Sequence, residues 1–200
     1  ENIVANTNGR HPRNAGDFWE KSERALLSAL TSYVYFAEGP TGTLNHVTGL
    51  LAEMSASEEN ENALSPVDAL FLSIEEELAN LEEHPDDYDQ EATRTLEGLS
   101  FPASQYNTYT QGAGETKKSI IISLGVRLAP LYIPEVQRLL SANSVDAGAV
   151  GQTKTALYLI VPDTHAAFTF LASIFYDMLF EKNLRTADKS PGGRLTVPVQ

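Results

Sequence analysis

The segment that most resembles a chemical site runs from Gly112 to Ser119 and reads Gly-Ala-Gly-Glu-Thr-Lys-Lys-Ser. A phosphate-binding loop of the form GxxxxGK[ST] needs glycine directly before the Lys-Ser pair, because the backbone must approach the phosphates without a Cβ in the way. That position is Lys117 here. The segment therefore predicts a break between helices with basic residues beside it, and no phosphate loop.

Other familiar catalytic and metal-binding patterns are missing from the sequence. The four histidines are widely spaced, whereas zinc sites need ligands at short, regular spacings. Asp86-Asp87 lacks the D-x-D-x-D-G loop of a calcium site, and no G-x-S-x-G motif marks a nucleophile. The absence of cysteine excludes disulfides and thiolate ligands. We therefore expect this 200-residue sequence alone to supply no catalytic residue, no metal site and no bound cofactor.

Three polar residues stand where a nucleotide or a neighbouring subunit could be contacted. Arg127 lies in the otherwise apolar stretch 124–131, where burying an unpaired charge is costly. It is expected either to pair with an acid or to point towards a neighbouring subunit or a phosphate. Asp163 and Thr164 directly follow a predicted strand, and the carboxyl ends of strands face the ligand crevice in open α/β sheets. Their alternative role is to cap the next helix.

Acidic side chains are concentrated in one segment. From Glu53 to Glu97 there are fifteen acids and one base, Arg94, which leaves 12 acids and 13 bases in the rest of the chain out of totals of 27 and 14. Such a surface repels the nucleic-acid backbone, so we expect no strong direct DNA binding here. It is either a solvated face or a docking face for a basic protein. The candidate docking residues are Glu75, Glu76, Glu77, Glu82, Glu83, Asp86 and Asp87.

Composition indicates a globular protein. The chain has 200 residues, of which 42% are hydrophobic and 20% are charged. The longest candidate for a membrane-spanning helix, 166–184, is interrupted by Asp177, Glu181 and Lys182. It therefore lacks the roughly 20 consecutive apolar residues that a spanning helix needs. We expect no membrane contact by this stretch. Without an initiator methionine or an apolar leader, it reads as a piece of a longer protein.

Helical patterns dominate the first 140 residues. After a loop or arm at 1–16, a helix is expected from Asp17 to the Gly39-Pro40 pair, which ends it. A second helix starts at Thr43 and runs into a polar linker. The third has the strongest start signal, because Ser65 can cap it and Pro66 suits its first position.

The later part of this region is expected to hold shorter helices. One is predicted from Asp86 to Gly98 and should end near Phe101-Pro102, because proline breaks helices. Further helical patterns cover 104–128, with a break near Gly112, and 133–140.

Beyond residue 141 the pattern changes. The compact apolar run Thr155–Val161 is typical of a buried parallel strand. A long helix from about His165 to Leu184 and a β-prone tail at Leu195–Val199 follow. This order indicates an α/β crossover unit. The sequence thus predicts a mainly α chain, with an arm at 1–16, a multi-helix bundle at 17–140 and a partial α/β domain at 141–200.

Five phrases in the sequence together carry a resemblance to a known family. They are Gly16–Leu27, Gln105–Ser123, Val126–Pro130, Ile133–Val136 and Lys154–Thr164. In this order they resemble the conjugative coupling proteins of the TraG/TraD type, which are the DNA-transfer ATPases of type IV secretion systems. The acidic segment has no counterpart in the resemblance.

The resemblance implies a membrane-anchored, hexameric parent motor with a RecA-like nucleotide-binding domain that contains an inserted all-helical domain. Residues 17–140 would be this inserted, substrate-recognition domain, and 141–200 would be part of the nucleotide-binding domain. ATP and magnesium would bind to the parent protein. The family's phosphate loop and magnesium-binding acid are missing from this sequence, so we expect no phosphoryl transfer by this stretch alone.

The resemblance also implies a location at the cytoplasmic face of the inner or plasma membrane. The implied partners are relaxase, other relaxosome proteins or secreted effectors, and an acidic multi-helix face attracts basic protein segments. The expected function is therefore recognition of the transferred substrate. Two alternatives stay open: a contribution to an inter-subunit ATP site through Arg127 or Asp163, and a purely structural helical insertion.

Overall fold

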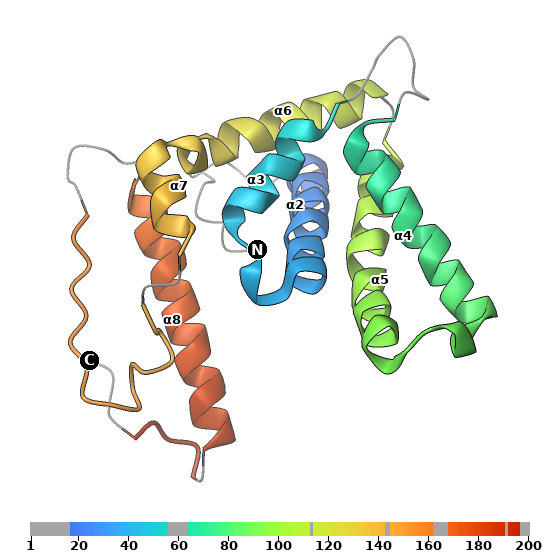
Figure 1. Cartoon of the computed structure of the whole chain (residues 1–200). Helices are drawn as coiled ribbons and strands as arrows, with labels where there is room; N and C mark the ends of the chain where they lie inside the picture. The colour runs from blue at the N-terminus through green and yellow to red at the C-terminus, as the bar shows by residue number, and fades with distance from the viewer. Residues whose placement is uncertain are drawn as a thin grey trace. The chain divides into compact units, whose positions relative to one another are not determined.

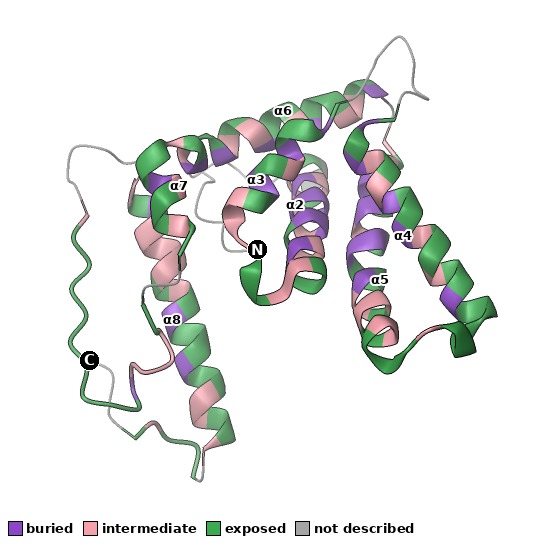
Figure 2. Cartoon of the chain, in the orientation of Figure 1, coloured by how far each residue is buried: buried purple, intermediate pink, exposed green. Residues whose placement is uncertain are grey.

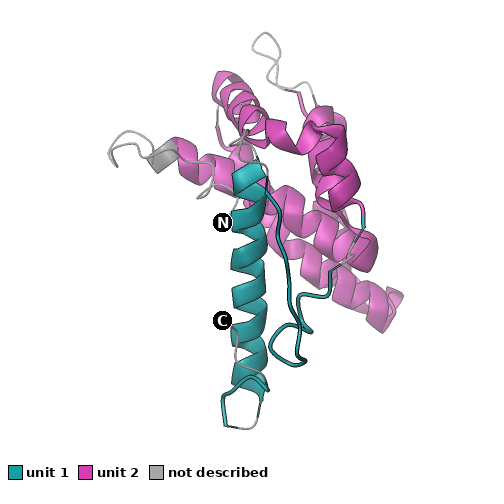
Figure 3. Ribbon diagram, turned by 90° about the vertical axis from the view of Figure 1, so that its left-hand side faces the viewer, with its two compact units in different colours: residues 1–10, 142–200 teal, residues 11–141 magenta. Residues whose placement is uncertain are grey.

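The computed structural model describes residues 17–55, 64–112, 114–142, 145–161, 168–190 and 192–196. The chain divides into two compact units, a helical unit within His11–Ser141 and a second unit that includes Ala142–Gln200 (Figure 3). All regular elements in the described ranges are α-helices or 3-10 helices, and an isolated bridge joins Val150 to Thr153. The prediction of a mainly α, multi-helix fold is confirmed.

In its described residues, the helical unit is built from α-helices and short 3-10 helices (Figure 1). Helix α5 packs against both α2 and α4, and α6 packs against α2 and α3. Its elements in chain order are α2 (Asp17–Glu38), η1 (Gly39–Thr41), α3 (Leu44–Glu53), α4 (Pro66–Glu83), η2 (Pro85–Asp87), α5 (Gln90–Thr110), α6 (Gly114–Leu128), η3 (Ala129–Tyr132) and α7 (Pro134–Leu140).

Apolar stripes at helical spacing form the core of this unit. Leu26 and Leu30 on α2, and Ile120, Leu124 and Leu128 on α6, are almost completely buried, as expected for side chains that recur every three or four residues. Burying each such side chain contributes about 1.5–3 kcal/mol. Figure 2 shows buried faces on α2 and α5, whereas much of α4 is exposed.

Local signals fix the start of α4 and the end of α2. Ser65 caps α4: its hydroxyl accepts from the Asp68 N–H, and the Asp68 carboxylate accepts from the Ser65 N–H at 2.7 Å. Helix α2 ends before Gly39, whose φ of 55° lies in the left-handed region that glycine adopts freely. The predicted cap and the predicted helix end are both confirmed.

The predicted break at Phe101-Pro102 is wrong, because α5 runs unbroken through Pro102. Proline inside a helix costs roughly 3 kcal/mol, since it removes a backbone hydrogen bond. Pro102 is buried together with Leu99, Ala103 and Tyr106 on one face of α5. Packing of this face offsets the local cost, so the two helices predicted for 86–98 and 104 onwards form one helix from Gln90 to Thr110.

The second unit contains α8 (Thr169–Lys189), which extends five residues beyond the predicted end at Leu184. The predicted strand at Thr155–Val161 is wrong, because these residues have no regular structure. Tyr158 and Ile160 are 85% and 92% exposed. A strand needs a hydrogen-bonding partner, and no described residue pairs with this run. Most of the predicted tail at 195–199 lies outside the described residues.

No single helix of the described ranges is long and apolar enough to cross a membrane. Gly114–Tyr132 and Pro134–Leu140 meet the requirements of length and composition only as a pair, and they are bent by 82°.

Candidate functional site

The seven predicted docking residues lie on α4 and η2, and we call them the acidic surface. Neither element contains Lys or Arg. Glu75 is half-buried and the other six residues are exposed. Like charges without compensating bases produce a strong local negative potential. The acidic surface comprises Glu75, Glu76, Glu77, Glu82 and Glu83 of α4 with Asp86 and Asp87 of η2.

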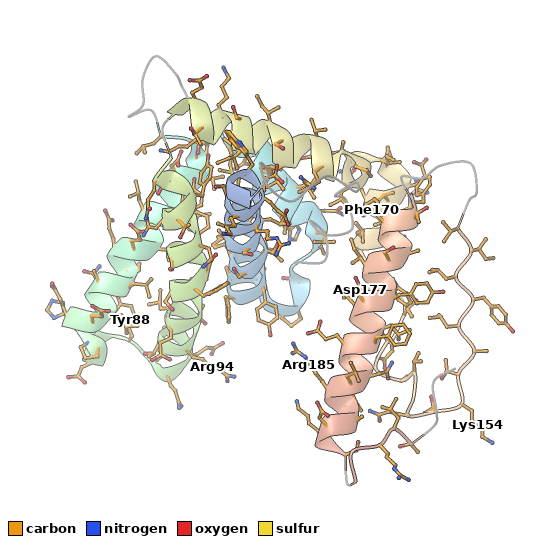
Figure 4. All side chains as sticks on the ribbon, turned by 180° about the vertical axis from the view of Figure 1, so that it is seen from behind. Tyr88, Arg94, Lys154, Phe170, Asp177 and Arg185 are labelled. Atoms are coloured by element: carbon orange, nitrogen blue, oxygen red, sulfur yellow. The ribbon has the colours of Figure 1, made fainter. Side chains whose placement is uncertain are left out.

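Two members of the acidic surface are held by neighbouring side chains. The Asn107 amide on α5 donates to the Glu75 carboxylate at 2.5 Å. The Tyr88 hydroxyl, just after η2, donates to Glu77 at 2.8 Å, and this bond raises the pKa of Tyr88 above its ordinary value. Helices α4 and α5 form a hairpin, and Figure 4 labels Tyr88 at the end of the hairpin where the chain passes from α4 to α5. The other five carboxylates form no ion pair within the described residues, so they are available to a partner.

A groove of about 510 Å³ runs between α4 and α5 on one side of the hairpin. Glu75 and Glu82 line it from α4 with Ala79 between them. Its opposite wall consists of uncharged side chains of α5 and of Gln111, the residue after α5, and most of them are small. These are Ser100, Ala103, Ser104, Asn107, Thr108 and Gln111, and Leu78 completes the α4 wall. The groove thus combines two carboxylates with a surface that has few bulky side chains.

The hairpin that carries this site is anchored by an aromatic cluster. The Tyr106 hydroxyl of α5 donates to Asp68 at 2.7 Å, and its ring stacks on Phe71 of α4 with centroids 4.0 Å apart. Tyr33 of α2 contacts Phe71 with centroids 5.8 Å apart. Burial raises the pKa of Tyr106 well above its ordinary value, and the hydrogen bond to Asp68 acts in the same direction. The acidic surface is therefore presented by helices fixed to the core.

Arg127 forms an ion pair inside the helical unit. Its guanidinium lies 2.8 Å from the carboxylate of Glu23, which is only 2% exposed and belongs to α2. Ser123 donates a hydrogen bond to the other Glu23 oxygen. Arg127 was expected either to pair with an acid or to point towards a neighbouring subunit or a phosphate. In the structure it pairs with an acid. The pair joins α2 to α6 and compensates a charge that would be costly to bury alone.

The partner of Arg127 was missed at the sequence level, although a signal for it exists. Glu23 lies four residues after Trp19 and three before Leu26. An acid at core spacing on an apolar helical face requires a counter-charge. Which basic residue pairs with Glu23 depends on how the helices pack against one another. The spacing of residues along one helix does not determine that packing.

The remaining predicted site residues lie elsewhere. Asp163 and Thr164 are outside the described residues. Within the described ranges, no three His, Asp or Glu side chains gather as ligands for a metal ion. Asn107 and the rest of the α5 groove wall were not predicted, because the expected helix break at Pro102 separated them from α4.

Comparison with known proteins shows the family of the chain. A family model described as Type IV secretory system Conjugative DNA transfer matches residues 1–194. No curated protein and no solved structure matches the chain. The matched range includes both compact units, so the similarity does not depend on the helical unit alone.

Proposed function

The chain belongs to the type IV secretory system conjugative DNA transfer family, and from that premise we propose that its helical unit recognises transferred proteins by binding their basic segments on the acidic surface. The partners are relaxase, other relaxosome proteins or secreted effectors, as the resemblance of the sequence implies. The parent protein supplies ATP hydrolysis and ring assembly. The helical unit acts before transport, when the substrate is selected.

The observation that carries this proposal is a set of five exposed carboxylates on an anchored hairpin, for which the described part of the chain provides no counter-charge. They are Glu76, Glu82, Glu83, Asp86 and Asp87. Exposed ion pairs contribute about 0.2–1 kcal/mol each, so recognition needs several of them together. Complementary charge also speeds association and selects against acidic partners and bare DNA.

The test is a binding measurement with two charge-matched variants of the full chain. The first variant neutralises the five exposed residues as Glu→Gln or Asp→Asn. The control variant makes the same number and kind of changes on exposed acids outside α4 and η2. These control positions are Glu115, Glu135, Asp146, Glu181 and Asp188.

We expect the first variant to bind the cognate relaxosome proteins roughly tenfold more weakly or worse, because several ion pairs are lost. Its binding should also depend less on salt concentration. The control variant should bind like the unmodified chain. Equal affinity of all three proteins would contradict the proposal and would favour a purely structural helical insertion.

A further inference from the structure

We infer that the groove between α4 and α5 binds a helix of the partner whose contact face carries two Lys or Arg residues seven positions apart, with small residues between them. This inference rests on the proposed function and specifies the chemistry of its partner. It concerns the groove, whereas the proposed function requires only the acidic surface as a whole.

The spacing of the two groove carboxylates sets the spacing of the bases. Glu75 and Glu82 are seven residues apart on α4, which is two helical turns and about 10.5 Å along the axis. They therefore share one face, and both line the groove. On a partner helix lying along α4, bases at positions i and i+7 repeat at the same distance on one face.

The small residues of the groove favour a helix as the occupant. Ala79 lies between the two carboxylates, and Ser100, Ala103 and Ser104 face it from α5. Interaxial distances between packed helices are 8–10 Å and depend on the side chains at the contact. A helix with small residues in the middle of its contact face could approach both α4 and α5 closely, as in other helix-in-groove complexes.

Two further side chains prepare this face for binding. Asn107 donates to one oxygen of Glu75, which orients the carboxylate and leaves its second oxygen to accept from a base. Leu72 precedes Glu75 by three residues on the same helical face and is 44% exposed. It offers an apolar contact beyond the charged pair. Orientation before binding lowers the entropic cost of forming the complex.

The test uses two helical peptides of identical composition and three forms of the full chain. One peptide carries Lys at i and i+7 with alanines between them, and the other carries Lys at i and i+5. The chain is tested unmodified, as Glu75→Gln with Glu82→Gln, and as Glu76→Gln with Glu83→Gln. The last pair is also seven residues apart, but it lies on the neighbouring face of α4.

The expected result is at least a fivefold preference of the unmodified chain for the i, i+7 peptide. This preference should disappear in the Glu75/Glu82 variant and persist in the Glu76/Glu83 variant. Ala79 is exposed and lines the groove. Ala79→Leu should fill the groove without changing the charge, and it should also abolish the preference for the i, i+7 peptide. Thermal unfolding of each variant would verify that the chain is folded.

Equal binding of the two peptides, or an equal effect of both charge variants, would overturn the inference. The relaxosome measurement separates this failure from failure of the proposed function. If the five-site variant still loses relaxosome binding, the acidic surface docks proteins in another way than through a helix with bases at i and i+7. If that binding is also unchanged, both proposals fail.

Discussion

At the scale of single residues, the interior of the helical unit depends on a buried charge pair. Glu23 and Arg127 belong to two of the phrases that carry the family resemblance, and their contact joins helices about a hundred residues apart in the sequence. Removal of one partner leaves an uncompensated charge, which costs more than the pair itself contributes. The pair therefore fixes how α2 and α6 meet.

Arg127→Met should lower the free energy of unfolding by roughly 3 kcal/mol, because it leaves Glu23 buried without its counter-charge. The double variant Glu23→Leu with Arg127→Met should recover most of this loss, since both charges are then gone. Urea denaturation of the three proteins measures the difference. A double variant as unstable as the single one would contradict this account.

Tyr106 should make the helical unit less stable at alkaline pH. Because its pKa is raised in the folded state, the folded chain holds the proton when an unfolded tyrosine loses it near pH 10. The stabilisation is complete below about pH 10 and is lost as the pH rises further.

Tyr106→Phe should cost roughly 1 kcal/mol at neutral pH, since the hydrogen bond to Asp68 is lost. It should also reduce the fall in stability above about pH 10. Urea midpoints at several pH values report both effects. Part of the fall should persist, because burial also raises the pKa of Tyr109. An unchanged pH dependence would show that Tyr106 does not cause it.

At the scale of the elements, the packing of α5 on α2 requires a glycine. A Cβ added at Gly98 would lie within 3.0 Å of the Phe36 ring of α2. An alanine in the interior of a helix usually stabilises it by about 0.5–1 kcal/mol relative to glycine. Close approach to α2 should reverse this sign at Gly98.

Gly98→Ala should therefore lower the unfolding free energy by roughly 1 kcal/mol, as in other overpacked contacts. Gly49→Ala on α3 is the matched control, because an added Cβ there meets nothing within 4 Å, and it should stabilise the chain. Thermal unfolding distinguishes the two. Stabilisation by both changes would mean that α5 and α2 do not pack as described.

Element boundaries were predictable where a local chemical signal determines them. Ser65 and Asp68 define the start of α4 by hydrogen bonds within one turn, and Pro66 suits its first position. Gly39 ends α2 through its own backbone conformation. Pro102 misled the prediction, because packing on the buried face of α5 outweighs its local cost. The run 155–161 misled it because strand formation depends on a partner elsewhere.

The same distinction holds for the site. Counting charges along the sequence identified the acidic residues of this surface, since all seven lie between positions 75 and 87. Asn107 is 32 residues from Glu75, and Arg127 is over a hundred residues from Glu23. Contacts of this kind follow from the packing of helices, so the groove and the identity of the acid that pairs with Arg127 were not predicted.

At the scale of the whole molecule, the family match covers both compact units. The helical unit carries the acidic surface on α4 and η2, opposite in charge to a basic substrate segment. The assignment of 17–140 to substrate recognition and 141–200 to a partial nucleotide-binding domain stays a prediction. It would give the helical unit a selective role in DNA transfer.

The central claim is that transferred proteins bind at the acidic surface, and hydrogen exchange of the full chain with and without a bound relaxosome protein tests it most directly. The account predicts slower exchange of backbone amides on α4, η2 and the facing turns of α5, with α6 and α7 unchanged. Protection confined to α6, α7 or the second unit, with none on α4, would contradict it.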